Sequence, residues 1–263
     1  KSYSTSFSLA VYMLAPSIRP AIYSIYGFVR FADEIVDTFH DYDKAKLLDE
    51  FEKNYRDALE NGISLNPILH SFCTTQREKN IPQHLVDAFL HSMRMDLGDI
   101  KDLNDEKYNE YIYGSAEVVG LMCLKVFVDG NEEEYQKLKP YAQSLGAAFQ
   151  KINFLRDISA DYTDLGRTYF PNVNFRNFSQ QDKLEIEKDI AKDFEHSLIG
   201  IKMLPMSSRL AVFMAYKYYT NLFKKIKKCK PEILMHKRIS VSNARKVYLF
   251  GEMILFKNLN FVR

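Results

Sequence analysis

The chain has 263 residues, 46% of them hydrophobic, and a formal net charge of +2. This length is sufficient for one large domain with a sizeable core, and the near-neutral charge gives no sign of a general nucleic-acid-binding surface. Ten glycines and eight prolines are few for this length, which argues against a turn-rich β fold.

The three cysteines, Cys73, Cys123 and Cys229, are far apart, and none belongs to a CxxC pair. This spacing suits a reducing compartment better than a disulfide framework. The sequence has no apolar run of about 18 residues, which a membrane-spanning helix would need. Its first residues also lack the charged start and the small-residue cleavage site of a signal peptide. We therefore expect a soluble, cytoplasmic protein.

The first two predicted helices have clear ends. The segment 17–39 has Pro20 in its first turn, where proline is tolerated. The segment 41–62 has Asp43 as its expected N-cap and Gly62 at its end. We therefore predict a helix over each of these segments.

Helical signals continue to the end of the chain. Capping-box spacings begin at Asn131 and Ser179. No segment alternates apolar and polar residues long enough to predict a strand, and no repeat or linker is evident. We therefore predict one all-α domain over residues 1–263, with further helices at about 83–97, 105–129, 140–164, 181–202, 206–229 and 241–257.

A polar strip runs along the otherwise apolar helix 17–39. A helix turns by about 100° per residue, so Asp37 lies about 40° from Asp33. Arg30 lies about 60° and Tyr26 about 20° from Asp33, on the same side. A helix that is apolar on nearly all sides is a buried one. Its single polar strip therefore faces either a partner or an internal cavity.

A second strip of the same kind lies on the predicted helix 140–164. Asp161 and Asn153 lie about 40° to either side of Asp157, and Gln150 lies about 20° from it. The other sides are largely apolar, although Lys151 interrupts them. Two antiparallel helices that faced each other in this way would bring four aspartates into one pocket.

Such a pocket predicts a bound cation. Carboxylates one turn apart repel each other, and burial raises their pKa. Oxygen ligands without cysteine or histidine favour Mg²⁺, whose open positions phosphate oxygens commonly fill. Arg30, Arg156 and Arg167 are available to pair with the same phosphates. One DxxxD pattern alone is most often structural, with an arginine as its ion-pair partner, but two on apolar helices favour a function.

The segments "YGFVRFADEIVD" and "QKINFLRDISADYTDLGRTYFP" resemble the two acidic motifs of the squalene/phytoene synthases. "STSFSLA" is similar to the substrate flap of that family, and "YIYGSAEVVGLM" to its middle motif, with Glu117 where the family usually has glycine. The resemblance covers about residues 3–250. It implies a single-domain terpenoid synthase fold with a central substrate cavity.

The resemblance also implies roles for individual residues. It implies that two or three Mg²⁺ ions (or Mn²⁺) and the diphosphates are held by Asp33, Asp37, Asn153, Asp157 and Asp161. It implies a flap over one diphosphate made by Tyr3, Ser4, Thr5 and Ser6. It implies that the substrate sites are lined by Phe7, Tyr26, Arg30, Gln150, Arg156 and Arg167, with Tyr218 as the late tyrosine of the family and Arg238 as a further diphosphate contact.

The implied reaction is a head-to-head prenyl transfer between two identical allylic diphosphates. Ionisation of one diphosphate requires that its charge is neutralised, which magnesium can do. The double bond of the second substrate then attacks the cation, which gives a cyclopropyl diphosphate. A second ionisation releases the remaining diphosphate and rearranges the ring to a 1–1′ linked hydrocarbon. The cation needs a dry site, and aromatic faces such as those of Phe7, Tyr26 and Tyr113 can stabilise it.

We expect a phytoene synthase that uses geranylgeranyl diphosphate, in carotenoid biosynthesis, as a monomer or weak homodimer. The alternative is a dehydrosqualene or squalene synthase that uses farnesyl diphosphate. The lack of a C-terminal anchor argues against a eukaryote-like squalene synthase, and without a GxGxxG motif we expect no nicotinamide cofactor. The absence of DDxxD motifs argues against a chain-elongating enzyme or a terpene cyclase, and the four retained aspartates argue against a non-catalytic relative.

Two further features have alternative interpretations. The small residues Gly114, Ser115, Ala116 and Gly120 either open a tunnel for an isoprenoid chain or allow close helix packing, and the resemblance favours the tunnel. The basic run 224–230 is either a solvated helix end or a surface that attracts anionic lipid, at the inner face of a membrane.

Overall fold

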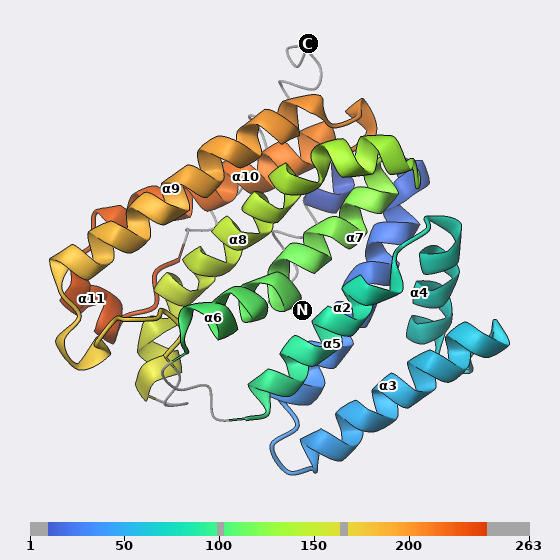
Figure 1. The fold of residues 1–263 in the computed structure, drawn as a ribbon, viewed down its shortest axis with the longest axis horizontal. Coiled ribbons are helices and arrows are strands. Elements are labelled where there is room, and N and C mark those ends of the chain that lie inside the picture. Colours follow the sequence, from blue (N-terminus) through green and yellow to red (C-terminus); the bar gives the residue numbers. More distant parts are fainter. Residues whose placement is uncertain (1–9, 99–102, 164–167, 241–263) are drawn as a thin grey trace.

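The computed structural model describes residues 10–98, 103–163 and 168–240, without the side chains of 160–163. Over these residues the chain is helical and contains no strand, as predicted. In Figure 1, α6 and α7 lie between a group formed by α2 to α5 and a group formed by α8 to α11. The elements in chain order are η1 (Pro16–Ile18), α2 (Arg19–Asp37), α3 (Lys44–Asn61), α4 (Pro67–Glu78), α5 (Gln83–Asp96), α6 (Asp105–Ile112), η2 (Tyr113–Glu117), α7 (Val118–Phe127), α8 (Glu132–Thr163), η3 (Phe175–Asn177), α9 (Gln180–Met203), α10 (Met206–Lys227) and α11 (Pro231–His236).

The predicted helix ends are confirmed where capping residues specify them. The Asp43 side chain accepts a hydrogen bond from the backbone N–H of Lys46 at 3.0 Å. Gly62 ends α3 with a φ of 76°, in the left-handed region that favours glycine. Ser179 and Asp182 form the reciprocal capping box at the start of α9.

The structure differs from the helix prediction in several places, and one predicted helix cannot be compared with it. The sequence analysis missed α4, although Asn66 caps it and Pro67 occupies its first turn. The predicted helix 105–129 is interrupted by η2, a single turn of π-helix, so that α6 and α7 are separate elements. The predicted helix 241–257 lies outside the described residues.

Two hydrophobic cores flank the centre of the molecule. In the first, the ring of Phe28 on α2 is fully buried and stacks on Phe72 of α4 with 4.0 Å between ring centroids. In the second, Phe154 of α8 stacks on Tyr169 at 4.1 Å. The apolar face of α2 is thus packed away from its acidic strip, because those side chains lie on opposite sides of the helix.

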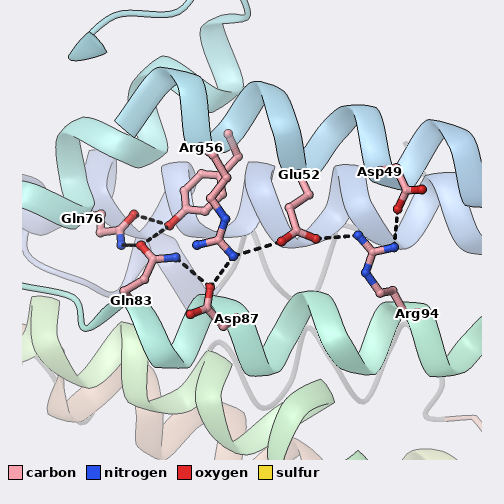
Figure 2. Close-up of polar contacts among 8 residues, drawn as sticks. Asp49, Glu52, Arg56, Gln76, Gln83, Asp87 and Arg94 are labelled. Atoms are coloured by element: carbon pink, nitrogen blue, oxygen red, sulfur yellow. Dashed lines mark hydrogen bonds and ion pairs between the residues drawn. The ribbon is translucent and has the colours of Figure 1, made fainter. Parts of the chain in front are cut away.

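A polar network joins the three helices that support α2 (Figure 2). At its buried end, the Tyr55 hydroxyl lies 2.9 Å from the Oε1 atoms of both Gln76 and Gln83. Towards the surface the network continues along α3 and α5 through Arg56, Asp87, Glu52, Arg94 and Asp49. These contacts fix α3, α4 and α5 to one another, and so fix the surface on which α2 lies.

Candidate functional site

A cavity of about 420 Å³ lies between the two cores. Its wall is formed by α2, η2, α7, α8, α9, α10 and the segment before η1. Most of the lining side chains are apolar, as is usual in pockets that bind small molecules. The polar side chains in the lining are Ser115, Tyr141, Gln150, Asn153, Ser197 and Tyr219.

Both predicted acidic helices form part of this wall. Val29 lines the cavity from α2, one turn before Asp33, and Asn153 lines it from α8, one turn before Asp157. In Figure 1, α2 and α8 run in the same general direction, so the predicted antiparallel arrangement is wrong. The two acidic motifs consequently follow the cavity on the same side of the molecule.

On α2 the acidic strip is neutralised within its own helix. The Arg30 guanidinium pairs with both Asp33 and Glu34. Burial and the neighbouring charge of Asp37 raise the pKa of Asp33 to about 6, and Arg30 only partly offsets this rise. Asp37 itself is exposed, and Tyr26 is half-buried one turn from Arg30. This strip therefore holds more negative charge than its own arginine compensates.

On α8 the strip is neutralised partly from a distant part of the chain. Asp157 pairs with the adjacent Arg156, and its Oδ1 also lies 2.7 Å from Nε of Arg238, which follows α11. Arg238 thus lies at the second acidic motif, where the resemblance made it a candidate contact. The backbone of Asp161 belongs to α8, but its side chain lies outside the described residues.

Of the two adjacent tyrosines on α10, Tyr219 lines the cavity, whereas the sequence analysis selected Tyr218. The Tyr219 hydroxyl donates a hydrogen bond to Oδ1 of Asn153 at 3.3 Å, and its ring stacks on Phe149 at 3.9 Å. Burial raises the pKa of Tyr219, so its hydroxyl stays protonated as a donor. Tyr218 packs edge-on against Tyr219. The sequence analysis did not select Phe149 and Tyr219. Several aromatic residues adjoin each motif, and the sequence alone does not show which of them faces the cavity.

Lys151, which interrupts the apolar side of α8, is directed away from the cavity. Its Nζ lies 2.5 Å from Asp189 and 2.7 Å from Asp193, both on α9. Its side chain is only 11% exposed. This ion-pair group joins α8 to α9 behind the cavity wall.

The small residues around η2 divide between close helix packing and the lining of the cavity. A Cβ atom on Gly114 would lie 2.5 Å from the carbonyl oxygen of Ala88, so this glycine permits close packing on α5. Ser115, Ala116 and Gly120 instead line the cavity. The π-turn allows both, because its extra residue rotates neighbouring side chains to different sides.

Glu117, at the position where the family usually has glycine, lies between η2 and α8. Its carboxylate accepts a hydrogen bond from Nε2 of Gln143 at 2.8 Å. Burial raises the pKa of Glu117, with a further contribution from Asp193, while Gln143 and Lys151 lower it. The glutamate therefore extends the polar contacts behind the cavity wall.

The acidic strips offer oxygen donors that fit a hard divalent cation such as Mg²⁺. The repulsion between Asp33 and Asp37 that raises the Asp33 pKa is the kind that a bound cation relieves. Within the part of the chain that the structure describes, no three or more Asp, Glu, His or Cys side chains are grouped to hold a metal ion. The described side chains that fit a magnesium ion are therefore Asp33 and Asp37 on α2 and Asn153 and Asp157 on α8.

Several predicted site residues cannot be placed. The residues that lie outside the described part of the chain are Tyr3, Ser4, Thr5, Ser6, Phe7 and Arg167. Their roles, like that of the Asp161 side chain, remain predictions.

Comparisons with known proteins identify the family to which the chain belongs. A model of the family described as squalene/phytoene synthase matches residues 1–245. The chain is 25% identical to the 4,4′-diapophytoene synthase of Staphylococcus haemolyticus, over 94% of this chain and 92% of that protein. It is 26% identical to the chloroplastic phytoene synthase 1 of Solanum lycopersicum, over 85% of this chain and 58% of that protein.

Solved structures show the same fold. A dehydrosqualene synthase superposes with a TM-score of 0.80 at 23% identity, covering 98% of this chain and 93% of that one. The squalene synthase HpnC from Alicyclobacillus acidocaldarius gives a TM-score of 0.76 at 19% identity, covering 90% of this chain and 91% of that one. The all-α fold around a central cavity is thus the one found in synthases of this class.

The family match extends over most of the chain, and it defines the class of enzyme as a prenyltransferase. More particularly, the chain belongs to the squalene/phytoene synthase family, which condenses prenyl diphosphates head to head. Among the described helices, none is both long and apolar enough to cross a membrane.

Proposed function

We propose that this protein is a magnesium-dependent phytoene synthase, which joins two geranylgeranyl diphosphates 1–1′ through a cyclopropyl diphosphate. The head-to-head chemistry is that of the family, whereas the substrate length and the metal are our proposal. The main supporting observation is an apolar cavity whose walls on α2 and α8 both continue into acidic strips.

The two ends of the site would have different roles, and the acidic end would bind the diphosphates. Magnesium, when bound, would neutralise the departing diphosphate. We propose that it is held by Asp33, Asp37, Asn153, Asp157 and Asp161. Arg30, Arg156 and Arg238, which pair with these carboxylates in the structure, would then be free to donate hydrogen bonds to the diphosphate oxygens.

The apolar end of the site would protect the cationic intermediates. The lining gives a carbocation few nucleophiles to react with and excludes water from it. The rings of Phe149 and Tyr219 provide aromatic faces there, and a protonated Tyr219 hydroxyl is a poor nucleophile. Tyr219 would also orient the amide of Asn153 through their hydrogen bond.

The lining of the cavity is long enough for the longer substrate. Its lining on α8 extends from Leu138 to Asn153, which corresponds to about 22 Å along the helix. An extended chain advances about 1.2 Å per bond, so a geranylgeranyl group is about 18 Å long and a farnesyl group about 13 Å. Small lining residues such as Ala116, Gly120 and Ala142 leave this length open.

A farnesyl substrate is the second candidate, because one relative is named a diapophytoene synthase and one structural neighbour a dehydrosqualene synthase. The deciding experiment incubates the purified protein and Mg²⁺ with each diphosphate separately and identifies the hydrocarbon by mass spectrometry. We expect a C40 product from geranylgeranyl diphosphate. A C30 product from farnesyl diphosphate alone would transfer the assignment to the second candidate, and no product from either would refute the enzyme function.

We further propose that the protein acts in the cytoplasm as a monomer or weak homodimer, and that it contacts a membrane surface peripherally.

A further inference from the structure

Positive charge is concentrated in one short segment of the chain. Residues 217–238 contain eight lysines and arginines and one glutamate, which gives a net charge of +7. Because the whole chain carries +2, the rest of the sequence carries −5. A distribution of this kind produces a surface field far stronger than the total charge suggests.

The structure places most of these charges on one exposed region, which we call the basic face. It comprises the last turn of α10 and the residues on either side of α11. All of its lysines are exposed, and none forms an ion pair with a carboxylate of the described residues: Lys224, Lys225, Lys227, Lys228, Lys230 and Lys237. Their charge is therefore available to an external partner.

The contacts that these lysines do make leave their charge intact. Nζ of Lys225 donates a hydrogen bond to the carbonyl oxygen of Ser240 at 2.7 Å. Nζ of Lys227 lies 5.4 Å from the centre of the Phe223 ring. Such contacts orient a lysine stem without neutralising its ammonium group.

An exposed apolar side chain lies between Lys230 and Lys237 in the sequence. Ile233 of α11 is 45% exposed, whereas Pro231 and Leu234 on the other side of this helix are buried. A soluble anion gains nothing from an exposed isoleucine, but a lipid surface offers both anionic headgroups and an apolar interior. The combination therefore favours a membrane over a free phosphate compound.

We propose that the basic face binds the surface of an anionic lipid bilayer. It adjoins the site described above, because α11 packs against α8 and Arg238, directly after Lys237, contacts Asp157. Docking there would bring the acidic end of the cavity close to the bilayer. The benefit of docking rests on the proposed function. Prenyl diphosphates are amphiphilic and their hydrocarbon product is soluble only in lipid, so a cavity close to the bilayer could exchange both with it.

The test measures co-sedimentation of the full chain with vesicles, without substrate. The vesicles contain phosphatidylcholine alone or an equal mixture with phosphatidylglycerol. We expect binding only to the anionic vesicles, and its loss in high salt because screening weakens exposed charges. Equal binding to both vesicle types, or to neither, would overturn the proposal.

A matched pair of triple variants locates the surface. In one, Lys228, Lys230 and Lys237 are changed to Gln; in the other, the exposed lysines Lys46, Lys53 and Lys202 on α3 and α9 are changed to Gln. We expect the first to lower the vesicle partition coefficient about 100-fold, at about fivefold per lysine, and the second to lower it less than about twofold. Equal losses in both variants would contradict the assignment of the face.

A turnover assay separates this proposal from its competitors. If the first triple variant bound vesicles normally but turned over soluble diphosphates more slowly at low salt, the face would steer substrate and the lipid proposal would be wrong. Vesicle binding by a protein that forms no hydrocarbon would support the proposal and refute only the proposed function. Circular dichroism of each variant confirms that the fold is intact.

Discussion

The helices α2 and α8 present similar acidic strips to one cavity, but they are held in place by different interactions. Behind the strip of α2, Phe28 is fully buried and stacks on Phe72 at 4.0 Å. Behind the strip of α8, Lys151 forms ion pairs with Asp189 and Asp193. Aromatic packing thus supports both helices, since Phe154 of α8 stacks on Tyr169, but among the described residues only α8 has a half-buried ion-pair group behind its strip.

The strips also differ in the origin of their counter-charges. Arg30 lies within the same helical turn as Asp33, whereas Arg238 reaches Asp157 from beyond the end of α11. The same DxxxD spacing can therefore occur in two electrostatic environments. The local spacing of the aspartates defines each strip, whereas tertiary contacts determine which counter-charges surround it.

The largest effect that we expect in the comparison between the two acidic strips is that of Asp157→Asn. The substitution keeps the shape of the side chain but removes a charge from the proposed metal site, so we expect turnover to fall about 1000-fold. Asp57→Asn, at an exposed position on α3, is the control and should retain normal turnover. Near-normal turnover in the first variant, with an unchanged circular dichroism spectrum, would remove Asp157 from the metal assignment.

Phe28→Ala tests the support behind α2. Because removing a fully buried aromatic ring leaves a cavity, we expect the free energy of unfolding to fall by about 4 kcal/mol. Urea denaturation followed by circular dichroism measures this change. Phe213→Ala, at a half-buried position on α10, should cost clearly less. Equal losses in the two variants would show that the aromatic core does not distinguish α2.

Lys151→Met tests the support behind α8. The methionine keeps most of the side-chain volume but leaves Asp189 and Asp193 without their cation. Since Asp189 is half exposed, we expect this loss to cost about 2 kcal/mol, less than for a fully buried pair. Lys188→Met, at an exposed position on α9, is the control.

The control variant should change stability by less than about 0.5 kcal/mol. Urea denaturation again measures both changes. Adding Asp193→Asn to the Lys151 variant should recover part of the loss, and an additive further loss would contradict the ion-pair explanation.

The sequence was sufficient to predict the all-α fold and both strips because these features have a local cause. Helical periodicity identifies a buried face, and caps such as Asp43 and Ser179 identify helix ends. The cavity between α2 and α8 followed from the resemblance and from the need of each polar strip for a partner. Apart from the resemblance, these predictions required only neighbours within one or two helical turns.

The remaining features depend on contacts that are distant in sequence. The π-turn that interrupts 105–129 packs Gly114 against Ala88, and no local pattern predicts that approach. The selection of Tyr219 over Tyr218 depends on how α10 is rotated towards Asn153. The relative direction of α2 and α8 depends on the whole chain between them, which explains the wrong antiparallel prediction.

The smallest expected effect concerns the unbalanced charge on α2. In the metal-free protein the pKa of Asp33 is raised from 3.8 to about 6, first by burial and then by Asp37. The folded state therefore binds a proton more tightly than the unfolded state, and stability falls as the pH rises from about 4 to about 6. The side chain is 37% exposed, so we expect this loss to be about 1 kcal/mol after allowance for solvent screening.

Asp33→Asn should remove this pH-dependent loss, so that in EDTA at about pH 7 the variant is about 1 kcal/mol more stable than the native protein. Mg²⁺ should reverse the order, because a ligand that binds only the folded state stabilises it, and only the native protein keeps this carboxylate. Thermal unfolding of both proteins, with and without Mg²⁺, measures both effects. If the variant were less stable in EDTA, the ion pair with Arg30 would outweigh the repulsion from Asp37, and α2 would resemble α8 in being stabilised by charge.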